Sequence, residues 1–402
     1  MLNFKIFILK NKEAIIKLLF FYILIKIIAW VFGLIVSSSF FQVFELEQFA
    51  SNDISLNDLY YKAKLKEKPD EEKDINKYTN EILIINSGTI KGDSSRLQFS
   101  HLINKIMHFK PAVVALDHYF EKKNKIGNDS LMNTFHDFSN IIVGNSPNNN
   151  NLFNKQSQLG NLDLPEGNTK RYYFNNSNTL AYKVAFKAKK TAHWKIDDES
   201  FPINYVTYLD GIYPYFPESD EVSCSPCRSN FRVIEASDLL NDHENDFVIE
   251  DFKDKIVLIG HVGPYEYSQK KFDIQDKFKV PTDTVIINRD KSMYGVIIHA
   301  NAILNIIHPE IKFKEFKGIW FDLFKVFIEL SYLSFLLFIR AGKLTNLFLL
   351  IAISTPFLFI VIYLMTFNIY ISIGLALLQL LIMEELIDII EPIWEKIKKF
   401  KK

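Results

Sequence analysis

The feature that most restricts the fold of this chain is the placement of its apolar residues, which gather at both ends. The block at 15–41 reads IIKLLFFYILIKIIAWVFGLIVSSSFF. At about 1.5 Å of rise per helical residue, it is long enough to cross a hydrocarbon layer of ~30 Å. Three more apolar stretches follow at about 318–339, 344–366 and 369–390. The sequence therefore predicts one membrane span, a large globular domain and three closely linked spans.

Basic residues in the short flanks set the expected orientation. Lysines precede the first span, Arg340 and Lys343 lie between the second and third, and a lysine-rich tail follows the fourth. Because positive flanks stay in the cytoplasm, both termini are expected there and the large domain outside. The first apolar block is long and no A-x-A cleavage motif follows it, so we interpret it as a retained anchor. The expected domains are a cytoplasmic N-terminus at 1–14, a transmembrane helix at 15–41, an extracytoplasmic α/β domain at 42–317, three transmembrane helices at 318–390 and a basic cytoplasmic tail at 391–402.

Composition narrows the expected partners. The 402 residues carry 47 basic and 47 acidic side chains, so nothing in the overall charge favours binding to nucleic acid. The richness in Lys, Ile, Asn and Phe is typical of an AT-rich genome. We therefore predict a multi-pass protein of the bacterial inner membrane, with the lipid bilayer as its first partner. The oligomeric state stays open, homo-oligomers included.

The middle domain alternates strand-like and helix-like segments. The strand candidates are short β-rich runs between breakers, at 81–88, 111–120, 140–144, 171–174, 231–236 and 254–260. Apolar residues at helical spacing predict helices at 96–109, 178–189 and 295–307. Another helix is predicted to begin at an Asp or Ser cap near residue 129. Strands and helices of this length that alternate along the chain favour an α/β fold with a mainly parallel sheet and right-handed crossovers.

The order of these segments resembles the CHASE sensory domain of the second type, named for sensory extracellular domains associated with cyclases and histidine kinases. The likeness rests on VVALD at 113–117, KIVLIG at 255–260, and Gly295 with His299 and Ala300 before the late spans. It implies a membrane-anchored sensory domain that detects a ligand or envelope signal. With only about a dozen residues after the last span, the signal would pass to a separate effector or envelope protein.

Two segments depart from the pattern that the resemblance implies. Many family members end the first strand on an acidic residue, where this chain has Asn86. Many also have a Trp/Pro-rich stretch before an arginine, where this chain has KGDSS before Arg96. A ligand site shared through the first strand is therefore in question. Two other functions stay open, a non-catalytic envelope scaffold and a periplasmic enzyme.

Four side chains form the candidate ligand site. Asp117 and His118 follow one predicted strand, His261 follows another, and His299 lies in the segment MYGVIIHANAILNII. If the two strands are parallel neighbours, their carboxyl ends share the sheet edge where α/β domains bind ligands. The simpler interpretation of His299 is a packing position that hydrogen-bonds a backbone carbonyl. A continuous helix over 295–307 turns Asn301 away from His299, so the two would not act on one substrate.

Catalytic, metal and cofactor sites are not predicted. The chain lacks G-x-S-x-G and H-E-x-x-H, and its histidines show no short two-ligand spacing such as H-x-x-x-H. Its only cysteines are Cys224 and Cys227, in SCSPCRS. One such pair cannot supply four thiolates to zinc, and a redox motif would open a helix after a strand. We therefore expect a local disulfide outside the membrane.

Charged residues interrupt the predicted spans. Lys26 lies near mid-depth of the first span, and Asp322, Lys325 and Glu329 share one helical face of the second. A charge facing lipid costs ~2.5–3.5 kcal/mol or more, so such residues normally face partners. We expect Lys26 to pair with Glu329 and Lys325 with Asp322. The cluster would act either as a static clamp between helices or as a switch.

Overall fold

The computed structural model describes most of the middle domain and parts of the apolar ends. The described residues are 12–36, 78–123, 125–145, 151–153, 155–165, 172–189, 200–205, 212–214, 231–241, 249–262, 277–278, 293–315, 318–339, 352, 359–360, 363–365, 367, 369–370 and 374–400. The chain divides into two compact units. We call Tyr61–Phe313 the α/β unit, and Met1–Tyr60 with Lys314–Lys402 the helical unit.

The α/β unit is built on one parallel sheet. Its seven strands lie in the order β4-β3-β2-β9-β1-β8-β7, and every pairing within it is parallel. The strands are β1 (Ile82–Asn86), β2 (Val113–Leu116), β3 (Ile141–Asn145), β4 (Leu159–Asn161), β7 (Ile212–Pro214), β8 (Phe231–Glu235) and β9 (Ile256–Gly260). The predicted α/β class with a mainly parallel sheet is confirmed.

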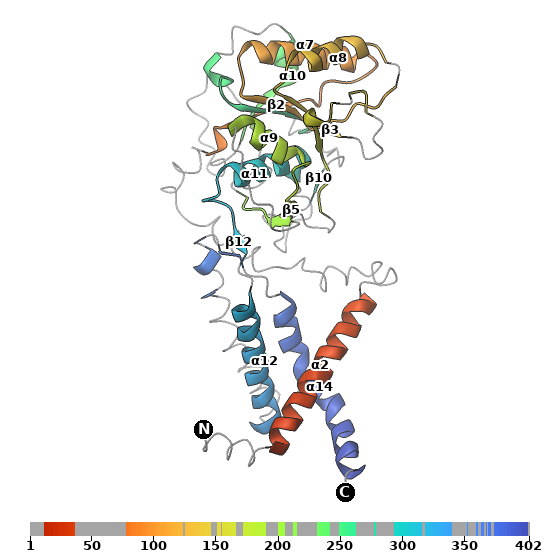
Figure 1. The fold of residues 1–402 in the computed structure, drawn as a ribbon, viewed down its shortest axis with the longest axis vertical. Helices are drawn as coiled ribbons and strands as arrows, with labels where there is room; N and C mark the ends of the chain where they lie inside the picture. The colour runs from red at the N-terminus through yellow and green to blue at the C-terminus, as the bar shows by residue number, and fades with distance from the viewer. Residues whose placement is uncertain are drawn as a thin grey trace. The chain divides into compact units, whose positions relative to one another are not determined.

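Helices cover both faces of this sheet (Figure 1). On one face lie α7 (Ser95–His108), α8 (Asn128–Asp137) and the short α10 (Ala236–Leu240), and on the other lie α9 (Leu180–Lys189) and α11 (Gly295–Ile307). The central strands β1, β2 and β9 are buried along their whole length. Such continuous burial is typical of a parallel sheet between two helix layers, and it explains why these strands are rich in Val, Ile and Leu.

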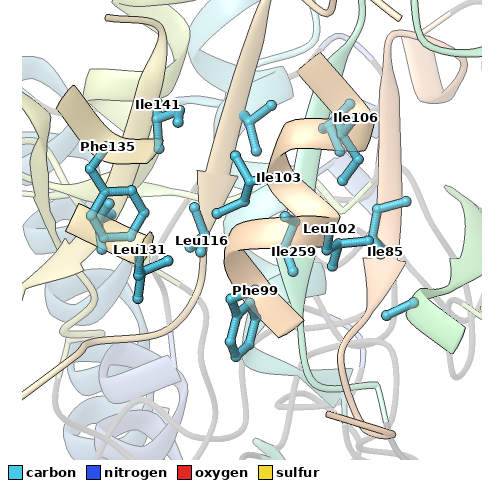
Figure 2. Packing of buried hydrophobic residues seen from close by; sticks show 14 of the residues in the cluster. Ile85, Phe99, Leu102, Ile103, Ile106, Leu116, Leu131, Phe135, Ile141 and Ile259 are labelled. Carbon is cyan, nitrogen blue, oxygen red and sulfur yellow. The ribbon is translucent and has the colours of Figure 1, made fainter. Parts of the chain in front are cut away.

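The core on the α7 side shows how the pattern of the sequence produces the packing (Figure 2). Alternate residues of the strands, among them Ile85, Leu116 and Ile259, meet the apolar stripe of α7 formed by Phe99, Leu102, Ile103 and Ile106. On α8, Leu131 and Phe135 complete the cluster beside Ile141 of β3. The intervening strand residues, such as Ile84 and Ala115, are buried toward α9 and α11.

Two sequence predictions needed correction. The helix α8 does not begin at an Asp or Ser cap, because its N-cap is Gly127 with φ of 86°, a left-handed conformation that suits glycine. The predicted strand at 171–174 exists as β5 (Tyr172–Phe174), but it pairs antiparallel with β6 (Ser200–Pro202) outside the main sheet. The short 3-10 turn η2 (Gln156–Gln158) leads directly into β4.

The remaining short elements complete the described fold. The 3-10 turn η4 (Ile249–Asp251) precedes β9, and β10 (Lys277–Phe278) pairs with β11 (Met293–Tyr294), which runs straight into α11. In the helical unit, β12 (Lys314–Glu315) pairs in parallel with β13 (Ile369–Tyr370).

The described residues of the helical unit include three long helices, namely α2 (Lys12–Val36), α12 (Ile319–Ile339) and α14 (Gly374–Phe400). They share a core that includes Phe21 and Ile25 of α2, Leu333 of α12 and Ile390 of α14. The described part of the chain contains no helix with both the length and the apolarity required of a membrane span. The segment 344–366, where a third span is predicted, lies almost entirely outside the described residues.

Candidate functional site

The candidate site lies at the carboxyl edge of the sheet, where β2, β9, β1 and β8 end side by side. Because side chains alternate along a strand, Asp117 follows β2 on the side of α9 and α11, whereas His118 turns toward α7. The His118 ring lies 5.0 Å from the Phe99 ring of α7, between ring centroids. The four predicted residues therefore form two groups on opposite sides of the sheet edge.

The first group joins Asp117 to His299 of α11. His299 Nε2 lies 3.8 Å from Asp117 Oδ1, and the side chains are 2% and 8% exposed. This distance is too long for a hydrogen bond but short enough for strong electrostatic coupling. The other oxygen, Oδ2 of Asp117, is buried and makes no hydrogen bond to any residue that the structure describes.

Close packing around Gly260 positions this group. A Cβ added at Gly260 would lie 2.7 Å from the Val296 side chain and 3.2 Å from Cβ of Asp117. The missing side chain at the end of β9 therefore allows the first turn of α11 to approach the sheet beside Asp117. That approach places His299, one turn further along α11, opposite the carboxyl group.

The other ring nitrogen of His299 bonds to Tyr173 of β5. Tyr173 Oη lies 2.7 Å from His299 Nδ1 and also accepts the backbone N–H of Ala181 at 3.4 Å. Tyr173 and His299 Nδ1 share this hydrogen bond, and Nε2 is the ring nitrogen that faces Asp117. The simpler interpretation of His299 expected a hydrogen bond to a backbone carbonyl, whereas the structure shows one to the Tyr173 side chain.

The second group centres on His118 and His261. His118 Nε2 lies 2.7 Å from the hydroxyl oxygen of Ser87, the residue that follows β1. His261 follows β9 and contacts the ring of Tyr294 at 5.7 Å between centroids. Its imidazole is near enough to His118 to lower the pKa of that histidine.

Burial controls the charge of these side chains. Loss of solvent raises the pKa of Asp117 to about 7. It lowers the pKa of His299 to about 4, and burial with the nearby His261 lowers the pKa of His118 to about 4 as well. Both histidines are therefore neutral at physiological pH and offer no positive charge to an anion. The Asp117 carboxyl, by contrast, changes charge near neutrality.

Asn86 organises the neighbouring end of β1. Its side-chain N–H groups donate to both carboxylate oxygens of Glu235 at 2.8 and 3.0 Å, and its oxygen accepts the backbone N–H groups of Gly88 and Val262, each at 3.0 Å. An acidic residue here could not donate to Glu235 and would face it as a like charge. The departure noted in the sequence thus fits the presence of Glu235 at the end of β8.

Arg96 has a structural role. Its guanidinium donates to the backbone carbonyls of Glu121 and Lys123 and to the side chain of Asn128. These bonds fix the segment between β2 and α8, while Arg96 itself is buried at the start of α7. The arginine therefore shapes a loop near the sheet edge and does not face Asp117.

The chemistry available to the site is limited. Ser87 and His118 resemble a nucleophile–base pair, but within the described residues no carboxylate bonds to His118 to orient its ring. The backbone N–H groups of Gly88 and Val262, which could bind an oxyanion, both donate to Asn86. No described group of three His, Cys, Asp or Glu side chains is arranged to hold a metal ion.

Asparagines anchor α11 to its surroundings. Asn301 donates to the carbonyl of Ile297 within its own helix at 2.9 Å, on a different side from His299. Asn305 and the backbone of Asn204 exchange two hydrogen bonds of 2.7 and 2.8 Å, as two paired strands would. The helix observed over Gly295–Ile307 confirms the predicted continuous helix and separates Asn301 from His299.

The charged residues of the predicted spans make contacts within the helical unit. Glu329 of α12 accepts from Lys26 Nζ at 2.9 Å and from the Tyr22 hydroxyl at 2.9 Å, both on α2. Lys325 lies 2.9 Å from Asp322 on the surface of α12. Further pairs join α2 to α14, with Lys17 3.0 Å from Glu391. The predicted disulfide of Cys224 and Cys227 lies outside the described residues.

Sequence reasoning missed two residues of the site, Ser87 and Tyr173. Ser87 lies at the carboxyl end of the first predicted strand, at 81–88, so it could have been found from the rule that neighbouring parallel strands end at the same edge of a sheet. Tyr173 gave no comparable signal, because it belongs to a small sheet distant in sequence and approaches His299 only through the packing of α9 on α11.

Comparison with known proteins identifies the family. The model of the CHASE2 domain matches residues 27–339, which is more than half of the chain. The chain belongs to the CHASE2 domain family. Neither the curated proteins nor the solved structures gave a match.

Membership of this family defines the general role of the domain. CHASE2 domains are extracellular sensory domains, and the family is sensory and not catalytic. The match begins within α2 and ends at the last residue of α12. Both helices are thus part of the CHASE2 module, together with the whole α/β unit between them.

Proposed function

We propose that this protein is a membrane-anchored CHASE2 sensor, whose α/β unit detects a signal at the carboxyl edge of its sheet and passes it to a separate partner. The candidate contacts are Asp117, His118, His261 and His299. The single observation that carries this proposal is the buried Asp117 carboxyl, whose Oδ2 has no hydrogen-bond partner among the described residues. An unsatisfied buried carboxyl costs free energy, and such groups concentrate at functional sites.

The proposal includes four transmembrane helices, with the α/β unit outside the bacterial inner membrane and both termini in the cytoplasm. The basic flanks of the predicted spans support this orientation. Large apolar side chains lie exposed on the helical unit, among them Ile23 on α2 and Phe327 on α12, which are 57% and 67% exposed. Exposed apolar side chains of this size are what lipid or another protein would cover.

The helical unit offers a route for the signal. The α/β unit lies between α2 and α12 in the sequence, and Glu329 joins these two helices through Lys26 and Tyr22. The N-terminal part of α2 in turn contacts the end of α14 through Lys17 and Glu391. A change at the ends of the α/β unit would thereby reach 391–402, the segment that we propose contacts a cytoplasmic effector.

A second candidate function, hydrolysis, rests on the 2.7 Å contact between Ser87 and His118. The arguments against it are the neutral His118 without an orienting carboxylate and the backbone N–H groups already bound by Asn86. We therefore favour a sensor that does no chemistry.

The test is capture of partners by the full-length protein from native membranes. The informative variant is the double change Lys396→Glu and Lys399→Glu, because both lysines are exposed on α14 and their replacement leaves the packed face of the helix intact. Lys122→Glu, at an exposed position of the α/β unit, is the matched control.

A sensor with a cytoplasmic output should retain a kinase, cyclase or other effector in the wild type and in the control. The tail variant should lose most of it. If all three forms bind only envelope proteins in equal amounts, the scaffold function replaces the sensor.

A further inference from the structure

We propose that the signal detected at this site is the proton, which Asp117 and His299 bind together in the interior of the α/β unit. This inference rests on the proposed sensory function and names its stimulus. Release of that proton would leave an unpaired carboxylate beneath α11 and loosen the packing of this helix.

The argument begins with access to the carboxyl group. Asp117 Oδ2 is sealed from solvent and has no hydrogen-bond partner among the described residues. Val296 and Gly260 close the space beside it, with 2.7 Å between the Val296 side chain and an added Cβ at Gly260. A larger ligand would have to open this packing before it could contact Oδ2, whereas a proton needs only a transient path through water.

The second step concerns the charge that faces Asp117. His299 approaches from α11 at 3.8 Å, and its other ring nitrogen shares a hydrogen bond with the Tyr173 hydroxyl of β5. On the sheet, His118 is the next residue of the chain and His261 follows the neighbouring strand β9. The helix α9 presents a buried apolar face to this region, while its Lys183 and Lys187 lie on its half-exposed side.

The described side chain nearest to the carboxylate, His299, offers it no positive charge. His299 is neutral because burial lowers its pKa, and burial lowers the pKa of His118 as well. Two coupled groups that share one buried space take up protons as a pair, so Asp117 and His299 bind one proton whichever atom carries it. A neutral pair is compatible with the packing of α11, and a lone carboxylate is not.

The third step is the element that responds. Every residue of α11 from Gly295 to Ile306 is buried, so a shift of this helix cannot be absorbed by exposed side chains. From its last residue, Ile307, only a short connection leads to α12 at Ile319. Within that connection His308 pairs with Glu81 at 2.9 Å, which ties it to the start of β1.

The experiment is hydrogen exchange of the full-length protein in lipid nanodiscs at pH 5, 6, 7 and 8, analysed for peptides of α11 after correction for the intrinsic pH dependence of exchange. Opening of α11 exposes Asp117 to water, so the open form holds the proton less tightly than the closed form. The protection of α11 in the wild type, divided by that in Asp117→Asn, should therefore fall by up to about tenfold for each pH unit between 5 and 7 and level off above this range.

Asp117→Asn removes the titrating carboxyl but keeps a side chain of similar shape and the buried His299, so its α11 protection should rise with pH from 5 to 6.5 and then stay constant. Asp163→Asn, at an exposed aspartate of the same unit, should retain the wild-type profile. If the wild type and Asp117→Asn show the same dependence on pH, the proton is not the signal.

Failure of this inference and failure of the proposed function give different results. An α11 profile that Asp117→Asn leaves unchanged, together with tail-dependent capture of an effector, leaves a sensor whose stimulus is another ligand. A pH-dependent α11 without any effector supports the proton site and overturns the sensory output.

Discussion

Replacement of Glu329 by alanine is expected to destabilise the helical unit by about 2–4 kcal/mol. The carboxylate is buried, with a side chain 4% exposed, and it accepts hydrogen bonds from both Lys26 and Tyr22. Its removal leaves the tyrosine hydroxyl and the ammonium group without this acceptor. The estimate lies at the lower part of the range for broken buried pairs because the Lys26 side chain is 38% exposed and can turn toward water or headgroups.

The measurement is the midpoint of reversible unfolding of the full-length protein in detergent micelles, followed by the emission of Trp394. This tryptophan packs against Phe20 of α2 with 5.2 Å between ring centroids, so its signal reports the joining of α2 and α14. The other three tryptophans are replaced by phenylalanine for this purpose.

Two control variants separate charge from packing. Glu329→Gln keeps the shape and an acceptor for Tyr22 but removes the charge, so its loss should be smaller than that of alanine. Asp322→Asn changes an exposed residue, 68% exposed, in a surface pair on the same helix and should alter the free energy of unfolding by less than about 0.5 kcal/mol. Equal effects of Glu329→Ala and Asp322→Asn would show that the Glu329 contacts contribute nothing to the assembly of these helices.

Asp117→Asn is expected to stabilise the α/β unit at neutral pH and to leave its stability unchanged near pH 4. Burial raises the pKa of Asp117 from 3.8 to about 7 in the folded protein. The group is protonated in both states below pH 4, so it has no cost there. Between pH 4 and 7 the unfolded chain releases the proton and the folded protein keeps it, so the free energy of unfolding falls as the pH rises.

The full difference in pKa corresponds to a loss of roughly 4 kcal/mol in the free energy of unfolding at and above pH 7. Water that enters when the folded protein relaxes around the charged carboxylate would make this loss smaller. Asparagine cannot ionise, so the gap between variant and wild type should widen from near zero at pH 4 to its maximum near pH 7. The measurement is urea unfolding of the full-length protein at each pH. Unfolding of the α/β unit is monitored by the hydrogen exchange of its peptides. A constant gap across this range would mean that Asp117 does not titrate in the folded protein.

Titration of the buried histidines changes the free energy of unfolding with pH in the direction opposite to that of Asp117. Burial lowers the pKa of His299 from 6.5 to about 4, so its stabilising contribution is complete above pH 6.5 and is lost as the pH falls toward 4. His299→Gln should therefore reduce the loss of stability on the acid side of the profile without affecting the alkaline side, and His118 should account for the remaining loss. The two variants together separate the contributions of Asp117 and His299 to the profile.

The sequence predicted the α/β class because the central strands carry strong and continuous apolar runs. The runs that became β1, β2, β3, β8 and β9 each have four or five buried or nearly buried residues. The strands that it missed, β4, β6 and β7, have only three residues each, too few for a periodic pattern. Their pairing depends on neighbours that are distant in the sequence.

The site was predicted in part for an equally physical reason. Carboxyl ends of parallel strands meet at one edge, which brought Asp117, His118 and His261 to the same region. The alternation of side chains along β2 already separates Asp117 from His118, but the sequence prediction treated them as one set. The contact of His299 with Tyr173 depends on how α11 packs against α9, and no local pattern encodes this.

The most direct test of the account is whether a change confined to Asp117 alters the helices that lead to the tail. Hydrogen exchange of α12 and α14 is measured in the full-length protein in nanodiscs, comparing the wild type with Asp117→Asn and with Asp163→Asn at pH 7.5. If the α/β unit is a sensor, Asp117→Asn should change the exchange of α12 or α14 several-fold, and Asp163→Asn should not. Identical exchange of both helices in all three proteins, while α11 itself responds, would contradict a sensory function and leave a scaffold.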